Sequence, residues 1–243
     1  MKITPLDEGI YHVDQQKHYQ LASHDDILPD QHMLRLSVRP FLVRTDAEVI
    51  LLDTGLEANV DNGYLIESLL AQHGINAKEV TKVLLSHLHN DHVGGLGYFQ
   101  NGIFKTHFNN ADIYLQQREL TFALGQQNNP SYNISLLQQL SRLPNLKLLT
   151  VDSGNITPNI TYQVVGGHTP YMQVFWLHDS NRIVFYGADD LPKKNYLYHH
   201  IAYKTDYDGR KAMQLRRQWE QQAKAEQWQV LLYHDTEEPF IQF

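Results

Sequence analysis

The chain has 243 residues and no cysteine, and this absence excludes several kinds of site. Disulfide scaffolds, zinc ribbons, iron–sulfur clusters and cysteine nucleophiles all depend on thiols. A metal ion bound by this chain would therefore take histidine and carboxylate ligands.

An excess of basic residues is also missing. The chain carries 20 Lys and Arg against 27 Asp and Glu, which gives a formal net charge of −7. Such a chain repels the phosphate backbone of a nucleic acid. We therefore expect no nucleic-acid partner.

Long apolar runs are absent as well. No stretch of about 18 apolar residues is present that could span a membrane. The N-terminal segment has Pro5, Asp7 and Glu8 where an export signal needs an apolar core of roughly 7–15 residues. The expectation is a soluble cytoplasmic protein without a membrane partner.

The chain does contain enough apolar sequence to fold, with 42% hydrophobic residues. Its apolar segments follow strand-like and helix-like patterns. Strands are predicted at 9–13, 34–44, 48–52, 80–86, 147–151, 161–165, 172–177, 183–186 and 229–233. Helices are predicted at 116–124, at 135–142, at 208–227 with Leu215, Trp219 and Ala223 inward, and at 60–73 with Val60, Tyr64, Leu65, Leu69 and Leu70 on one face.

This order of elements indicates a mixed fold of the α/β (α+β) class. Two strand-rich halves, roughly 1–125 and 145–243, each carry an outer helix and suggest two sheets packed face to face in one domain, 1–243. The segment 125–142 begins with a Gln/Asn-rich stretch, and it fits either a solvated connection or a lid over a site.

Histidine is unusually frequent, with 14 residues, and the sequence HLHNDH stands at 87–92, directly after a predicted strand. In an extended segment, side chains two residues apart point the same way, so His87 and His89 can converge on one ion. Asp91 and His92 can approach as the chain turns. The following Gly-Gly pair lets the backbone pass close to such a site.

These four ligand-type residues are too many for one tetrahedral zinc ion with an open position and too few for two ions. Further ligands must come from the ends of other strands. His168, Asp189 and His234 each follow an apolar strand and are the candidates, and Asp190 competes with Asp189.

Several segments resemble the metallo-β-lactamase-fold hydrolase superfamily, in particular its dinuclear members with a lactonase or glyoxalase II-like ligand set. The similar segments are spread over nearly the whole chain: LDTG at 52–55, SHLHNDHVGGL at 86–96, GGHTP at 166–170, YGADDLP at 186–192 and YHD at 233–235. The resemblance implies a four-layer αββα sandwich. It also implies two zinc ions per chain, although iron and manganese accept the same ligand types.

The resemblance also implies a role for each candidate. On the family pattern, one ion is bound by His87, His89 and His168, the other by Asp91, His92 and His234, and Asp189 bridges them. Asp53 lies behind a ligand histidine and orients it. Asp190 is then interpreted as a solvated or capping residue. Seven histidines are interpreted as non-ligands: His12, His18, His24, His32, His73, His107 and His178.

Such a site hydrolyses substrates, because two divalent cations provide hydroxide at neutral pH and stabilise the attacking and departing oxygens. We expect a metal-bridging hydroxide to cleave a small ester, lactone, thioester or related bond, with Asp91 and Asp189 as the catalytic carboxylates. The small-molecule substrate would meet the segment that carries Tyr196, His199, His200 and Tyr203. The same aromatic segment also fits a surface loop or the contact of a homodimer.

Departures from known subfamilies limit the choice of substrate. Many β-lactam hydrolases of this fold use a cysteine ligand, and glyoxalase II-like thioesterases continue into a helical domain after the last ligand. Homoserine-lactone lactonases place a tyrosine three residues after the bridging aspartate, where this chain has Pro192. The alternatives are an iron-dependent oxidoreductase or sulfur dioxygenase of the same fold, a phosphodiesterase, and a metal-binding protein without catalysis.

Overall fold

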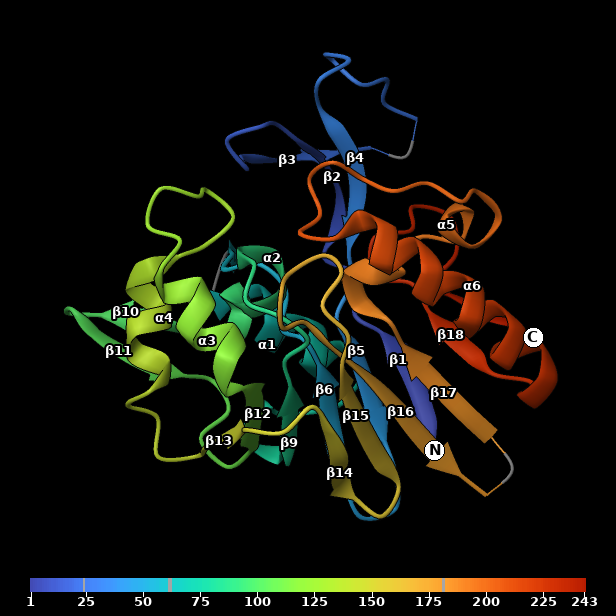
Figure 1. Ribbon diagram of the computed structural model, residues 1–243. Coiled ribbons are helices and arrows are strands. Elements are labelled where there is room, and N and C mark those ends of the chain that lie inside the picture. The colour runs from blue at the N-terminus through green and yellow to red at the C-terminus, as the bar shows by residue number, and fades with distance from the viewer. Residues whose placement is uncertain (24, 61–62, 181) are drawn as a thin grey trace. The chain divides into compact units, whose positions relative to one another are not determined.

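The computed structural model describes residues 1–23, 25–60, 63–180 and 182–243. It divides into two compact units, Met1–Leu149 (unit 1) and Thr150–Phe243 (unit 2). Each unit contains a six-stranded sheet together with helices (Figure 1). The predicted mixed α/β class is confirmed. No helix in the described part of the chain combines the length and apolarity that crossing a bilayer requires.

The main sheet of unit 1 has the strand order β1-β5-β6-β9-β12-β13. Its strands are β1 (Lys2–Pro5), β5 (Phe41–Arg44), β6 (Val49–Leu52), β9 (Lys82–Leu84), β12 (Asp112–Gln116) and β13 (Leu146–Leu149). The strands from β6 to β13 pair in parallel. Carboxyl ends of parallel strands meet at one edge, so the residues that follow β6 and β9 are brought together there.

Smaller elements complete unit 1. A three-stranded sheet contains β3 (Tyr19–Ala22), β2 (Gly9–Val13) and β4 (Leu34–Val38), and two strand pairs are β7 (Asn59–Val60) with β8 (Gly63–Tyr64) and β10 (Gly97–Gln100) with β11 (Ile103–Thr106). The helices are α1 (Leu65–Gln72), α2 (Asn90–Val93), α3 (Gln117–Leu124) and α4 (Ile134–Leu140), with the 3-10 turns η1 (Ala77–Glu79) and η2 (Gly94–Leu96). Leucines, valines and isoleucines from the sheet and from α1, α3 and α4 form a shared buried core.

The sheet of unit 2 has the order β14-β15-β16-β17-β18-β19. Its strands are β14 (Ser153–Thr157), β15 (Ile160–Val164), β16 (Gln173–Asp179), β17 (Arg182–Tyr186), β18 (Gln229–Leu231) and β19 (Phe240–Gln242), and its helical elements are η3 (Ala188–Asp190), α5 (Asn195–Tyr198) and α6 (Gly209–Glu226). Strand β16 runs antiparallel to β15 and β17, whereas β17 and β18 are parallel. Therefore β15, β17 and β18 all end at the same edge.

Helix α6 illustrates how sequence produces an element here. Asp208 precedes it, and its side chain accepts a hydrogen bond from the backbone N–H of Lys211, which caps the first turn. The buried positions Ala212, Arg216, Trp219 and Ala223 recur every three or four residues. Leu215, which was expected to point inward, is only half-buried, because the buried stripe passes through the neighbouring arginine instead.

Two predicted elements differ from the structure. The helix expected at 60–73 begins at Leu65, so Val60 and Tyr64 lie in short strands, while residues 61 and 62 of that prediction lie outside the described residues. Tyr64 has an extended backbone (φ −108°, ψ 142°) and cannot continue a helix. The strand expected at 34–44 is two strands of different sheets, because the chain changes sheet at Arg39 and Pro40.

Candidate metal centre

The first group of candidate ligands lies in unit 1, just beyond the carboxyl end of β9. The ring of His87 lies 4.6 Å from that of His89 and 4.1 Å from that of His92, measured between centroids. His87 and His92 are fully buried, and Asp91 is 6% exposed. The motif at 87–92 therefore gathers three imidazoles and one carboxylate in a small, largely water-excluded volume.

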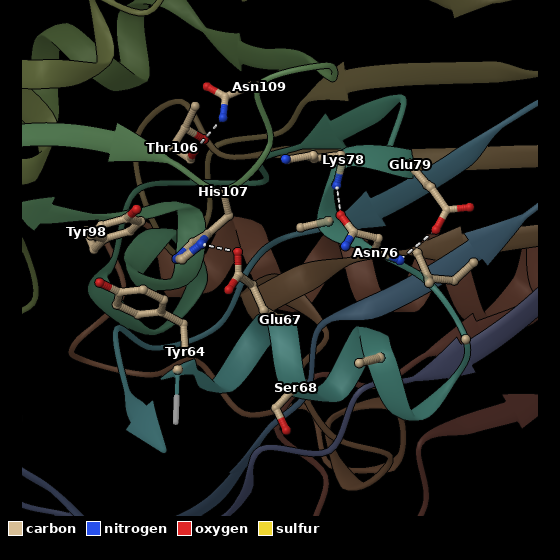
Figure 2. A pocket seen from close by; sticks show the side chains of 15 residues that line it. Tyr64, Glu67, Ser68, Asn76, Lys78, Glu79, Tyr98, Thr106, His107 and Asn109 are labelled. Carbon is tan, nitrogen blue, oxygen red and sulfur yellow. Dashed lines mark hydrogen bonds and ion pairs between the residues drawn. The ribbon is translucent and has the colours of Figure 1, made fainter. Parts of the chain in front are cut away.

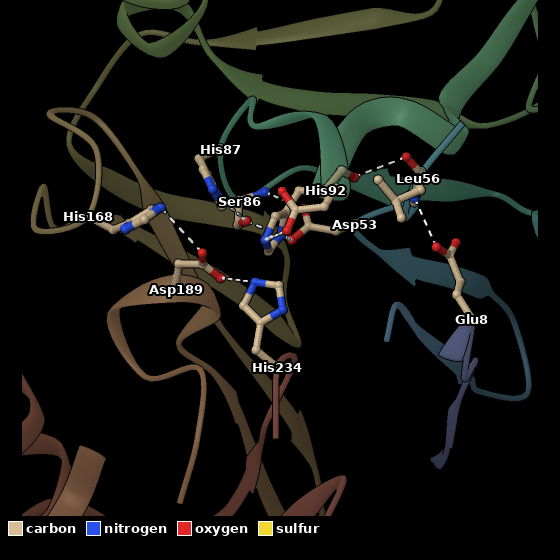
Figure 3. Close-up of polar contacts among 11 residues, drawn as sticks. Glu8, Asp53, Leu56, Ser86, His87, His92, His168, Asp189 and His234 are labelled. Carbon is tan, nitrogen blue, oxygen red and sulfur yellow. Dashed lines mark hydrogen bonds and ion pairs between the residues drawn. The ribbon is translucent and has the colours of Figure 1, made fainter. Parts of the chain in front are cut away.

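Asp53 supports this group from the end of β6. Its Oδ2 lies 2.8 Å from Nδ1 of His92 and accepts a hydrogen bond from the Ser86 hydroxyl at 2.6 Å, and its Oδ1 accepts from the Ser86 backbone N–H at 2.7 Å (Figure 3). An Nδ1–H that donates to Asp53 leaves Nε2 of His92 with a lone pair for a metal ion. Asp53 has φ +56°, a conformation that these hydrogen bonds and its full burial hold in place.

Ser86 is a site residue that the sequence reasoning missed. Besides contacting Asp53, its hydroxyl lies 3.0 Å from Nδ1 of His87. One serine thus links the carboxylate of Asp53 to the first histidine of the motif. The only signal in the sequence is its place immediately before that histidine.

The glycines that follow His92 allow a second segment to pack against the ligands. A Cβ at Gly95 would clash with the carbonyl oxygen of Thr54, and one at Gly94 would clash with the backbone N of Glu57. The backbone N–H of Thr54 donates to the carbonyl of His92 at 2.7 Å. The Gly-Gly pair therefore makes room for the turn that follows Asp53.

Glu8 is a second residue that the sequence reasoning missed. Its Oε2 accepts a hydrogen bond from the backbone N–H of Leu56 at 3.0 Å, and its side chain fills the space where a Cβ of Gly55 would stand. Burial raises the pKa of Glu8 well above its usual value, despite the Leu56 hydrogen bond that lowers it. A buried acid thus holds the turn that supports His92.

The segment 125–142 packs onto the ligand motif within unit 1. The backbone N–H of Asn90 donates to the carbonyl of Ser131 at 2.8 Å. The ring of Tyr132 meets the ring of His89 edge-on at 4.7 Å between centroids. Ser131 and Tyr132 are both buried, so this part of the segment forms a fixed wall beside His89, whereas the polar stretch before it is largely exposed.

The second group of candidate ligands lies in unit 2. His168 follows β15, Asp189 follows β17 and His234 follows β18, so all three stand at the same edge of the sheet. Oδ2 of Asp189 lies 3.3 Å from Nε2 of His168, and Oδ1 lies 3.1 Å from Nε2 of His234 (Figure 3). One carboxylate thus faces two imidazoles with separate oxygens.

Asp206 is the carboxylate that orients His168, and no pattern in the sequence indicates this role. Its Oδ1 lies 2.8 Å from Nδ1 of His168, the same relation that Asp53 has to His92. Burial by itself lowers the pKa of His168, but the carboxylates of Asp189 and Asp206 outweigh it and the pKa is raised.

Asp190 was interpreted as solvated or capping, and this is wrong. The residue is fully buried, and its Oδ1 accepts a hydrogen bond from the backbone N–H of His168 at 2.7 Å. Burial raises its pKa to about 7. A Cβ at Gly167 would clash with its carboxylate, so the glycine before His168 permits this contact. Asp190 therefore fixes the backbone of a candidate ligand.

The predicted substrate residues fall into two groups. Tyr196 and Tyr203 stack with centroids 4.6 Å apart and planes 11° apart, and the guanidinium of Arg216 lies 5.2 Å from the centroid of Tyr196. Burial raises the pKa of the Tyr196 hydroxyl. His199 and His200 are exposed, so the structure brings the tyrosines together and leaves these histidines at the surface.

The histidines interpreted as non-ligands occupy varied places. His107 pairs with Glu67 and His18 with Asp14. His12 is buried in β2, whereas His32, His73 and His178 are exposed. His24 lies outside the described residues.

Comparisons with known proteins agree with this fold. The family model of the metallo-beta-lactamase superfamily matches residues 35–194, more than half of the chain. No curated protein matches the chain.

Several solved structures are similar over nearly their whole length. A probable metal-dependent hydrolase from Staphylococcus aureus is 18% identical, with 99% of this chain and 91% of that chain covered and a TM-score of 0.79. The dizinc quorum-quenching lactonase AidC is 21% identical (98% and 88% covered, TM-score 0.74), and the hydrolase AbOPH of the beta lactamase superfamily is 20% identical (99% and 89% covered, TM-score 0.76). At these identities the likeness shows the fold, and the predicted fold is confirmed.

Proposed function

Because the chain belongs to the metallo-beta-lactamase superfamily and carries the histidine and aspartate clusters of a metal-dependent hydrolase, we propose that its two donor groups form one dinuclear zinc centre. The centre would hydrolyse a small ester, lactone, thioester or related bond. In this proposal His87, His89 and His168 bind one ion, Asp91, His92 and His234 bind the other, and Asp189 bridges them.

The observation that carries the proposal is the pairing of histidine with carboxylate in each unit. The carboxylate of Asp53 lies 2.8 Å from Nδ1 of His92, and the carboxylate of Asp206 lies 2.8 Å from Nδ1 of His168. Such partners are typical of metal-binding histidines, because they fix the tautomer and turn Nε2 toward the ion. Asp189 adds to this support, since its two oxygens face two different histidines and suit a bridging carboxylate.

Two divalent ions would supply hydroxide at neutral pH and polarise the bond that is cleaved. The protein residues have distinct tasks around them. Asp53, Ser86 and Asp206 keep the ligand imidazoles in one orientation. Asp91, whose Oδ2 lies 4.0 Å from Nε2 of His92, would bind the second ion and carry a proton toward the leaving group. The hydroxyls of the stacked Tyr196 and Tyr203 would contact a small substrate.

A lactone or carboxylic ester is the substrate class that we favour. AidC, one of the similar structures, is a dizinc lactonase. This chain has Pro192 three residues after Asp189, so a carbonyl oxygen would need another hydroxyl donor, and Tyr196 and Tyr203 are the candidates.

Elemental analysis together with a substrate panel tests this function. The protein purified without added metal should contain close to two zinc ions per chain and should hydrolyse members of a panel of lactones, thioesters, aryl esters and phosphodiesters. A content of one iron per chain, with oxygen uptake in the presence of a persulfide, would instead support the iron-dependent alternative.

A further inference from the structure

Unit 1 contains a cavity of about 920 Å³ that is lined by none of the proposed metal ligands (Figure 2). Its walls come from β8, α1, η1, β10, the end of β11 and the segment that follows it. This volume lies within the range of small-molecule sites, roughly 300–1,000 Å³. The two ends of the cavity differ in their side chains.

One end is an aromatic corner formed by Tyr64, Tyr98, His107 and Glu67. The rings of Tyr64 and Tyr98 stack with centroids 4.3 Å apart. The ring of His107 packs 4.6 Å from Tyr64 and 5.1 Å from Tyr98. The stack covers the facing sides of the two tyrosine rings, and these contacts hold both rings in fixed orientations at the cavity wall. The ring faces outside the stack therefore need no reordering before a ligand binds.

The aromatic corner carries a negative charge from Glu67. Oε1 of Glu67 lies 2.9 Å from Nδ1 of His107, and the glutamate side chain remains 46% exposed. Burial lowers the pKa of His107 in spite of this contact, which favours the neutral imidazole, so His107 does not balance the charge of Glu67. Burial raises the pKa of the Tyr64 hydroxyl, and the nearby Tyr98, Glu67 and Glu57 raise it further.

The other end of the cavity has a mixed charge. Lys78 and Glu79 of η1 lie there beside Asn76, away from the two tyrosines (Figure 2). Glu79 is already engaged, because its Oε2 accepts a hydrogen bond from the backbone N–H of Asn76 at 2.7 Å. The positive charge of Lys78 makes this end unsuitable for a cation.

We propose that the aromatic corner binds the cationic group of a small organic molecule, such as an alkylammonium. Tyrosine faces attract cations through their ring quadrupoles, and Glu67 adds a full negative charge at the same place. The proposal concerns a site separate from the metal centre and does not depend on the function proposed above.

Binding of choline tests this site. Choline carries a quaternary ammonium, and 3,3-dimethylbutan-1-ol has the same shape without the charge. Titration calorimetry and amide chemical shifts of the full chain should show saturable choline binding in the millimolar range. The largest shifts should fall on Tyr64, Glu67 and His107. The neutral alcohol should bind at least fivefold more weakly.

Matched variants locate the binding. Glu67→Gln should weaken choline binding about fivefold or more, whereas Glu79→Gln, with the same change of charge at the other end of the cavity, should change it less than twofold. Tyr98→Leu should abolish binding, and Tyr98→Phe, which keeps the ring, should retain it. Far-ultraviolet circular dichroism of each variant checks that the chain remains folded.

Three results would overturn the proposal. The first is an absence of saturable choline binding up to about 50 mM, well above the range expected for such a site. The second is equal affinity for choline and for the neutral alcohol. The third is equal weakening by Glu67→Gln and Glu79→Gln, which would indicate a general effect of charge and no ligand at the aromatic corner.

Discussion

Asp189 presents one carboxylate oxygen to His168 and the other to His234, at 3.3 and 3.1 Å. If it bridges two ions, removing it affects both. We expect Asp189→Ala to abolish turnover and to reduce metal content at both positions. His234→Ala should remove mainly one ion. Turnover and elemental analysis measure both effects, with the exposed His178→Ala as the control. Full activity in Asp189→Ala would refute the bridging role.

Asp206 contacts His168 through the nitrogen that faces away from Asp189. Replacing such a partner of a metal-binding histidine costs on the order of 10–100-fold in metal affinity or activity. We expect Asp206→Asn to weaken the binding of one ion by this amount, as measured by competition with a chelator.

Asp208→Asn is the matched control for Asp206→Asn. Asp208 caps α6 only two residues away, and asparagine caps helices as well as aspartate does. The control should therefore retain metal affinity. Equal affinity in the two variants would show that Asp206 does not orient a ligand.

Because His107 is buried, we expect the stability of unit 1 to depend on pH. Burial lowers its pKa below the usual 6.5, so the unfolded chain binds a proton more readily than the folded one. The contribution of His107 to the free energy of unfolding is therefore complete above pH 6.5 and is lost as the pH falls through the lowered pKa. Urea unfolding of metal-free protein at pH 7 and pH 5 should show a smaller loss of stability in His107→Gln than in the unsubstituted chain. An identical loss in both would contradict this assignment.

At the scale of elements, the turn after β6 packs on the start of η2. The carbonyl of Thr54 occupies the place of a Cβ on Gly95, and the backbone N–H of Gly95 donates to Gly55 at 3.0 Å. Overpacking at such a site costs about 1–3 kcal/mol, so we expect Gly95→Ala to lower the free energy of unfolding by about this amount. Gly63→Ala, where no atom lies within 4 Å of an added Cβ, should change it by less than about 0.5 kcal/mol. Urea denaturation measures both, and equal effects would contradict the packing argument.

The spacing of apolar residues predicted several helices and strands correctly. The helix at 116–124 is observed as α3, and the strand at 9–13 is observed as β2. The helix predicted at 60–73 was too long. Helical spacing of apolar residues continues through Val60 and Tyr64, but these residues belong to the strand pair β7 and β8. Spacing of apolar residues limits which face is buried, but strand pairing decides where a helix begins.

At the scale of the whole molecule, the proposed centre takes four ligands from unit 1 and three from unit 2. A metal ion that binds only the folded chain stabilises it, by about 2.7 kcal/mol when free metal is a hundredfold above Kd. Dialysis against a chelator should therefore abolish activity and lower Tm by several degrees, roughly 2–4 °C per kcal/mol for a chain of this size. Added zinc should restore both. Unchanged Tm and activity in protein shown to be metal-free would refute the proposed centre.

The sequence by itself determined the class of the fold and the donor residues available for a metal ion. Strand and helix periods are local, and the spacing at 87–92 is local too, so both can be read without the structure. The ends of apolar strands also pointed to His168, Asp189 and His234, because strands that run in the same direction within one sheet end at a shared edge.

Only the tertiary structure decided which residues support those donors. Asp206 is 38 residues from His168 along the chain, Asp190 is buried against the backbone of that histidine, and Glu8 holds a turn 48 residues away. The side chain of an aspartate or glutamate usually lies in solvent, and it is buried only where the fold supplies hydrogen-bond partners. Its role is therefore set by how the connecting loops fold onto the strand ends, which no local pattern encodes.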